Sequence, residues 1–143
     1  MFDEQLPFDV ENNGRERKKN KNRKPEVECY TCFLPSGAVQ KHIIEIQEFT
    51  SFHYDMWNRP YIIATPRYHY HTLFEMEPEE QAQLWSDIFH FMKKMGFDDF
   101  QCLFNNGEWQ THHHLHIKIR CDEVKVREMR RLHLIQNFPK MLK

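Results

Sequence analysis

A dense histidine stretch in the second half of the chain constrains the fold most. Four of the ten histidines lie within residues 112–116 of the 143-residue chain. Over residues 115–119 apolar and polar residues alternate, a period-two pattern that predicts a β-strand. In such a strand the apolar side chains face a core, and the polar side chains share the other face. Those polar side chains are His112, His114, His116 and Lys118. A row of imidazoles beside an ammonium group suits either metal binding or phosphate chemistry.

The composition indicates one globular domain. A hydrophobic content of 40% and an aromatic content of 14% are enough to build a single core. The sequence has neither an apolar run long enough to span a membrane nor an apolar signal segment. We therefore expect a soluble protein of the cytoplasm or nucleus, without a membrane partner. In that compartment the four cysteines argue against a disulfide framework.

Residues 1–26 are expected to form a basic, disordered arm that precedes a folded domain over residues 27–143. The segment from Arg15 to Lys24 is a charge run without apolar periodicity. Such runs stay solvated, and some bind nucleic acid or act as nuclear-import signals. Both a solubilising tail and a nucleic-acid contact are consistent with this composition.

A Cys-x-x-Cys pair opens the folded part. Cys29 and Cys32 can bind one tetrahedral ion, and zinc needs about four such ligands. The chain has no second pair of this kind, so further ligands must be histidines. Pro35-Ser36-Gly37 follows in place of a helix, which favours a metal role over a redox role. The other two cysteines, Cys102 and Cys121, are expected to be buried thiols.

The remaining pattern predicts an α+β fold. Alternating or β-branched runs predict the strands, which are residues 44–49, 51–57, 61–65, 100–104 and the histidine stretch. A helix is predicted from Pro78, with acidic residues in its first turn, to Gly96 at its C-terminal end. A second helix, rich in cations, is predicted over residues 124–135.

Taken together, these motifs resemble the histidine-triad (HIT) superfamily. The resemblance covers residues 28–121 and rests on Pro66-Arg67-Tyr68-His69, the long helix, Asn105-Asn106-Gly107, Gln110-Thr111 and the alternating histidine stretch. It implies a HIT-like fold, with an antiparallel sheet of about five strands, one long helix and a C-terminal helix. Family habit also suggests a homodimer.

The register of the family motif, in which three histidines alternate with apolar residues, can be chosen in two ways. Counting from Gln110-Thr111 makes His114 the first histidine and His116 the central one, with Lys118 in the third position. A literal reading takes His112, His114 and His116 as the triad. We prefer the first, because it places apolar residues correctly at positions 115, 117 and 119.

The resemblance implies a nucleotide hydrolase or nucleotidyltransferase that acts at an α-phosphate through a nucleotidyl-histidine intermediate. His116 would be the nucleophile, with His114 and Lys118 beside it in the catalytic motif. The expected nucleotide and phosphate contacts are Asn105, Gln110, Thr111 and Asp55. Asp55 lies near the position of the family's ribose-binding acid.

The resemblance also implies a structural zinc ion. Its ligands would be Cys29, Cys32, His69 and His114, with His71 as a competitor for His69. Two alternative functions follow from the same residues. One is a zinc-stabilised HIT-like module that binds nucleotide or RNA without turnover, consistent with Lys118 and the basic arm. The other is a zinc hydrolase in which the alternating histidines hold a catalytic metal, but the outer two lie about 13 Å apart in a strand.

Overall fold

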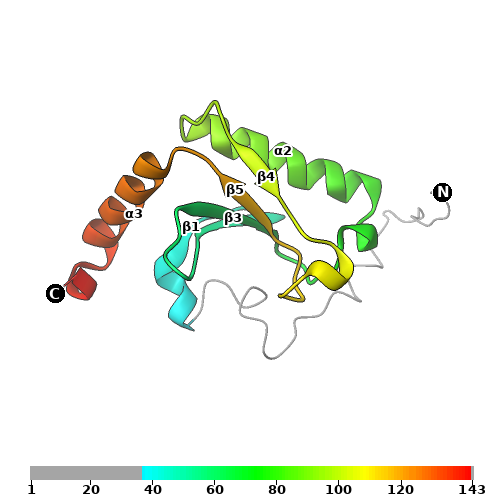
Figure 1. The fold of residues 1–143 in the computed structure, drawn as a ribbon, viewed down its shortest axis with the longest axis horizontal. Coiled ribbons are helices and arrows are strands. Elements are labelled where there is room, and N and C mark those ends of the chain that lie inside the picture. The colour runs from blue at the N-terminus through cyan, green and yellow to red at the C-terminus, as the bar shows by residue number, and fades with distance from the viewer. Residues whose placement is uncertain (1–36, 143) are drawn as a thin grey trace.

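The computed structural model describes residues 37–142, which contain a five-stranded antiparallel sheet and two α-helices (Figure 1). The strands are β1 (Ile43–Ile46), β2 (Thr50–Tyr54), β3 (Tyr61–Pro66), β4 (Gln101–Leu103) and β5 (Ile117–Arg120). Their order across the sheet is β1-β2-β3-β5-β4. This confirms the predicted α+β sheet. The basic arm and the Cys-x-x-Cys pair lie outside the described residues.

The long helix α2 (Pro78–Lys94) starts and ends where the sequence predicts. Pro at the first helical position costs no hydrogen bond, and the Glu80 carboxylate accepts a bond from the Glu77 amide at 2.8 Å. Gly96, with φ of 85°, follows the last turn in the left-handed conformation that glycine adopts readily. Both ends are therefore fixed by local chemistry.

The apolar stripe of α2 packs on one face of the sheet. Its buried side chains include Leu84, Ile88, Phe91 and Met92. The ring of Phe91 stacks on Phe52 of β2 with centroids 4.0 Å apart. Ile117 and Ile119 of β5, both fully buried, complete the same core. The opposite face of the sheet is thus left for the polar side chains.

The histidine stretch is only partly a strand, which corrects the prediction. β5 begins at Ile117, and residues 111–114 form bends. The Leu115 amide donates to the Tyr70 carbonyl at 2.7 Å, outside the sheet ladder. Strict alternation therefore fails before residue 115. His113 is exposed although the pattern put it on the core face, and His114 is fully buried although the pattern put it on the polar face.

The C-terminal helix α3 (Glu123–Asn137) supports the outer end of β2. Its Arg130 donates to the Asp55 carbonyl at 2.9 Å and to His42 Nδ1 at 3.0 Å. Burial, followed by the charge of Arg130, lowers the pKa of His42 to about 4, so the ring stays neutral and accepts this bond. The terminal helix thereby fixes the turn after β2.

Two further expectations concern the cysteines and the membrane. Cys102 and Cys121 are half-buried free thiols, and burial raises the pKa of both, that of Cys121 to about 11.

Within residues 37–142, no helix combines the length and apolar character that crossing a bilayer requires.

The packing of α2 yields a stability prediction. Phe91→Ala should lower the free energy of unfolding by about 3–5 kcal/mol, because it opens a cavity beneath Phe52. Phe89→Ala on the same helix is the matched control, since Phe89 is 53% exposed and its loss should cost about 1 kcal/mol or less. Chemical denaturation of both variants measures the difference, and equal costs would contradict this core assignment.

Candidate functional site

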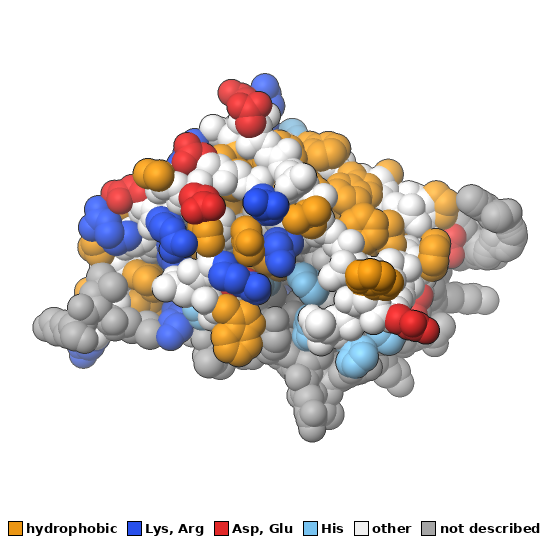
Figure 2. Space-filling model, in the orientation of Figure 1, with side chains coloured by type: hydrophobic (Ala, Val, Ile, Leu, Met, Phe, Trp, Pro, Cys, Tyr) orange, Lys and Arg blue, Asp and Glu red, His pale blue; other side chains and the backbone are white. Residues whose placement is uncertain are grey.

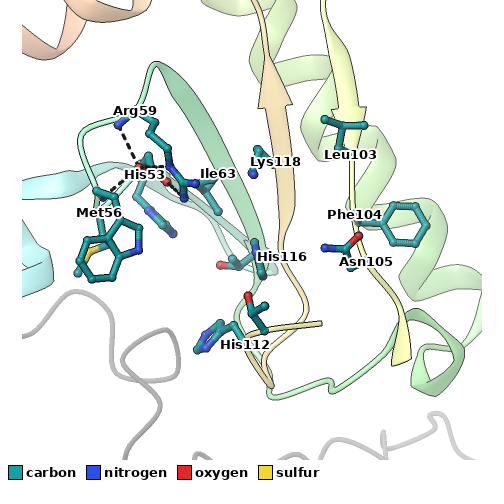
Figure 3. Close-up of a pocket in the computed structure, with 14 residues that line it drawn as sticks. His53, Met56, Arg59, Ile63, Leu103, Phe104, Asn105, His112, His116 and Lys118 are labelled. Atoms are coloured by element: carbon teal, nitrogen blue, oxygen red, sulfur yellow. Dashed lines mark hydrogen bonds and ion pairs between the residues drawn. The ribbon is translucent and has the colours of Figure 1, made fainter. Parts of the chain in front are cut away.

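A cavity of about 380 Å³ opens on the face of the sheet opposite α2 (Figure 3). Its walls come from β2, the turn after it, β3, β5 with the loop before it, and the end of β4 with the residues that follow. In Figure 3, His116 and Lys118 lie between His53 and Arg59 on one side and Leu103 and Asn105 on the other. Strands that are distant in sequence therefore share one site.

The cavity brings together five of the seven residues predicted for catalysis and nucleotide binding. The predicted residues in its lining are Asp55, Asn105, Thr111, His116 and Lys118. Gln110 is absent from the lining: its amide donates to the carbonyls of His71, at 2.7 Å, and His112, at 3.3 Å. It therefore organises the loop. His69 and His114 lie outside the lining as well.

His116 is held in one tautomer. Its Nδ1 lies 3.3 Å from the His114 carbonyl oxygen. Because a carbonyl only accepts, Nδ1 carries the proton of the neutral ring and Nε2 keeps its lone pair. Burial, with the nearby positive charge of Lys118 as a smaller cause, lowers the pKa of His116. The neutral, nucleophilic form is thus favoured.

Lys118 brings positive charge to the same wall. Its Nζ lies 4.9 Å from the centre of the Tyr61 ring, a cation–π contact that holds the ammonium in place. Among the described residues no carboxylate forms an ion pair with it. Figure 2 shows lysine and arginine side chains gathered on this face, with histidines beside them. An anionic ligand would therefore meet an uncompensated cation.

Asp55 lines the cavity, but its carboxylate is heavily engaged. It accepts four hydrogen bonds, from the Trp57 amide and from the amide and guanidinium of Arg59, at 2.9–3.0 Å. Burial alone would raise the pKa of Asp55, but these bonds and the charge of Arg59 outweigh it and keep the pKa low. The carboxylate fixes the turn after β2, in which Asn58 has φ of 65°.

Among the cavity residues that the sequence reasoning missed, two are candidates for ligand contacts. His53 is buried, and its Nδ1 donates to the Tyr54 carbonyl at 2.8 Å. Its Nε2 is the one buried side-chain nitrogen or oxygen without a partner within the described part of the chain. Trp57 lines the cavity while 79% exposed. The spacing of His53 two residues before Asp55 was the available signal, since strand residues i and i+2 share a face.

His114 and His69 form a separate pair outside the cavity lining. The Nδ1 atoms of the two rings are 3.1 Å apart. His114 Nε2 donates to the Pro66 carbonyl at 2.8 Å, which leaves the Nδ1 lone pair of the neutral ring for its other contacts. Burial is the main cause that lowers the pKa of His114, to about 3, so the ring is neutral.

These features fit metal ligands. A zinc-ligating histidine is neutral and donates its second ring nitrogen to a carbonyl or carboxylate, as His114 does. Of the two competitors, His69 contacts His114, whereas His71 contacts His113. Residues 37–142 by themselves hold no group of three or more metal-ligating side chains. Cys29 and Cys32, the other expected ligands, lie outside that range.

The described chain has the HIT-like fold, as solved structures show. A histidine triad protein from Clostridium difficile superposes with a TM-score of 0.59 and 22% identity, over 69% of this chain and 94% of the other. A Zn-bound histidine triad family protein from Mycobacterium smegmatis superposes with a TM-score of 0.55 and 18% identity, over 76% of this chain and 94% of the other. A HIT family hydrolase from Legionella pneumophila Philadelphia 1 superposes with a TM-score of 0.55 and 15% identity, over 64% of this chain and 90% of the other. No protein-family profile and no curated protein matches the sequence.

Proposed function

We propose that this chain is a HIT-type enzyme that cleaves a nucleotide at its α-phosphate through an intermediate on His116. The observation that carries the proposal is the bond between His116 Nδ1 and the His114 carbonyl, which leaves Nε2 as the nucleophilic atom at the cavity wall. The HIT hydrolase among the structural neighbours supports the same reaction class.

The reaction has two displacements at phosphorus. In the first, Nε2 of His116 forms a P–N bond while the bond to the leaving group breaks, and the leaving group departs with the bonding electron pair. In the second, water attacks phosphorus, the P–N electron pair returns to Nε2 and the nucleoside monophosphate leaves. Another acceptor in place of water would give nucleotidyl transfer.

Lys118 takes the third position of the motif in this mechanism. Its ammonium offsets the negative charge that develops on the phosphate oxygens and on the leaving atom, and it can supply that atom with a proton. Asn105 and Thr111, which also line the cavity, can donate hydrogen bonds to phosphate oxygens. Gln110 would act indirectly, by holding the loop that carries Thr111.

The nucleoside would be recognised by the β2 side of the cavity. His53 Nε2 is an acceptor in the neutral ring, which suits a sugar hydroxyl. Burial lowers the pKa of His53 and keeps the ring in that form. Trp57 offers an exposed aromatic surface at the same cavity, and a base can stack on such a surface.

We also propose a structural zinc ion held by Cys29, Cys32, His69 and His114. The convergence of two imidazole Nδ1 atoms at 3.1 Å and the Zn-bound neighbour support it. When bound, zinc would stabilise the fold around His114 and would leave phosphate chemistry to the cavity residues.

The alternative is a HIT-like module that binds nucleotide without turnover. Lys118 in place of the third motif histidine is the observation that favours it. Binding of a nucleotide together with absence of any covalent adduct would decide for this alternative.

The zinc proposal predicts different results for neighbouring histidines. His69→Asn and His114→Asn should each lower the zinc content and the melting temperature, because structural zinc binding contributes folding free energy. His112→Asn is the control: its ring lies beside His114, with centroids 6.4 Å apart, but belongs to the cavity lining. Elemental analysis and thermal unfolding measure both effects. Wild-type zinc content in His114→Asn would contradict the ligand assignment.

The nucleophile prediction concerns His116. His116→Asn should abolish the covalent adduct and reduce turnover by far more than the roughly hundredfold loss of one hydrogen-bond donor, while zinc content stays at one ion per chain. Nucleotide phosphoramidates, dinucleoside polyphosphates and capped nucleotides are the substrates to test, and mass spectrometry of a trapped adduct locates the modified residue.

His112→Asn provides the matched comparison for this experiment, since His112 and His116 both line the cavity and their ring centroids are 5.7 Å apart. It should weaken turnover but keep the adduct on His116. An adduct on His114, or full activity in His116→Asn, would show that the motif register is wrong by two residues.

The stacking role of Trp57 predicts a loss of binding that another exposed tryptophan does not share. Trp57→Ala should weaken nucleotide binding by about 1–3 kcal/mol, and Trp57→Phe should recover part of it. Trp109→Ala is the control, because Trp109 is 81% exposed and lies outside the cavity lining. Equilibrium titration with a non-hydrolysed nucleotide measures both, and equal affinities for Trp57→Ala and the wild type would reject the stacking role.

A further inference from the structure

A second pair of histidines lies at the surface beside the buried pair. His71 Nε2 and His113 Nδ1 are 3.0 Å apart, and their rings meet edge to face with centroids 4.9 Å apart and an interplanar angle of 86°. The buried pair, His69 and His114, has the same centroid separation and an angle of 85°. Both His71 and His113 are exposed. The outer pair therefore repeats the geometry of the inner pair in contact with solvent.

From this geometry we propose that His71 and His113 bind a second metal ion, separate from the structural zinc. Metal–nitrogen bonds of about 2.0–2.1 Å at a tetrahedral angle place two ligating nitrogens roughly 3.3 Å apart. The observed separation of 3.0 Å requires only a small rotation of the rings. The ion replaces the hydrogen bond between the two rings, and the donor ring binds it as the tautomer that carries its proton on the other nitrogen.

A hydrogen bond between His71 and His113 would do little to hold the two rings together. A hydrogen bond between two exposed imidazoles exchanges water contacts for one protein contact, so its net contribution to stability is small. A metal ion gains two ligands whose backbones are already fixed. The His71 amide donates to the Glu75 carboxylate at 2.8 Å, and the His71 carbonyl accepts from Gln110 at 2.7 Å. The preceding carbonyl, of Tyr70, accepts from Leu115 at 2.7 Å.

The ligand set defines the class of metal. Two imidazoles favour Zn²⁺, Ni²⁺ or Cu²⁺ over Mg²⁺ and Ca²⁺, which prefer oxygen ligands. The Glu75 carboxylate beside His71 adds negative charge, which suits a cation. Water fills the remaining coordination positions, so this ion exchanges faster and binds more weakly than a fully protein-ligated zinc.

Occupation of the outer site links the loop that carries two cavity-lining residues to a segment outside the lining. His71 belongs to the connection between β3 and α2, and His113 follows the cavity-lining His112 directly. An ion held by both would reduce the motion of the loop over residues 111–114. Added metal should therefore raise the melting temperature of the zinc-loaded protein, because it binds the folded state only.

The experiment uses the untagged, zinc-loaded full chain and titrates it with Ni²⁺ by calorimetry, since an added histidine tag would itself bind nickel. We expect one weak nickel site per chain. His71→Asn and His113→Asn should each lower its affinity by about tenfold or more, and the double variant should add little to either. Zinc content should not change.

The matched control is His90→Asn, which removes an exposed histidine from α2 and should leave nickel binding as in the wild type. All three side chains are exposed, so the variants should fold. Nickel affinity in His71→Asn or His113→Asn equal to that of His90→Asn would overturn the proposal. These measurements involve no turnover, so failure of the outer site is distinguishable from failure of the proposed enzyme activity.

Discussion

The burial of the His114 imidazole is the constraint on which the core, the predicted zinc site and the cavity all depend. The ring has no exposed surface, and its Nε2 donates to the carbonyl of Pro66 at the end of β3. Its own carbonyl lies against Nδ1 of His116 and sets the tautomer of that ring. A shift of this one residue would thus change a proposed metal ligand and the orientation of the proposed nucleophile together. The hydrogen bonds of Gln110 and Leu115, which hold the loop before β5, therefore keep both features in place.

Burial also determines the charge of the histidines that line the cavity. Loss of water contact is the first cause that lowers the pKa of His53, His112 and His116, and the pKa of His112 falls to about 4. In the unfolded chain these rings would titrate near 6.5. Folding therefore becomes less favourable as the pH falls below that value, because the unfolded state binds more protons. At neutral pH these rings are therefore neutral, and positive charge in the cavity comes from lysine and arginine.

Local signals made much of the fold predictable. Pro78 and Gly96 mark the long helix because their backbone preferences act within a turn, and the alternation of residues 115–119 identified the buried face of β5. The burial of His114 depends on contacts that no local sequence pattern contains. These are the hydrogen bond between Leu115 and Tyr70 and the bond from His114 to the Pro66 carbonyl. The partner of His113 is likewise 42 residues away in sequence.

The site was predictable to a similar extent. Periodicity placed His116 and Lys118 on one face, as found, because both adjoin or belong to the regular part of β5. The engagement of Asp55 by Arg59 depends on a tight turn whose geometry was not evident from composition. His53 became a candidate only through the pairing of β2 with β3, which buries its ring and leaves Nε2 without a partner among the described residues.

The lysine at position 118 has a physical consequence that a histidine could not reproduce. Burial lowers the pKa of the cavity histidines, so a third imidazole in this wall would also be neutral at physiological pH. Lys118 instead brings an ammonium group, which the Tyr61 ring holds near His116 without cancelling its charge. The substitution thus exchanges a hydrogen-bonding ring for an ammonium group. Such a wall favours ligands whose phosphate groups carry more negative charge, because the attraction increases with the charge on the ligand.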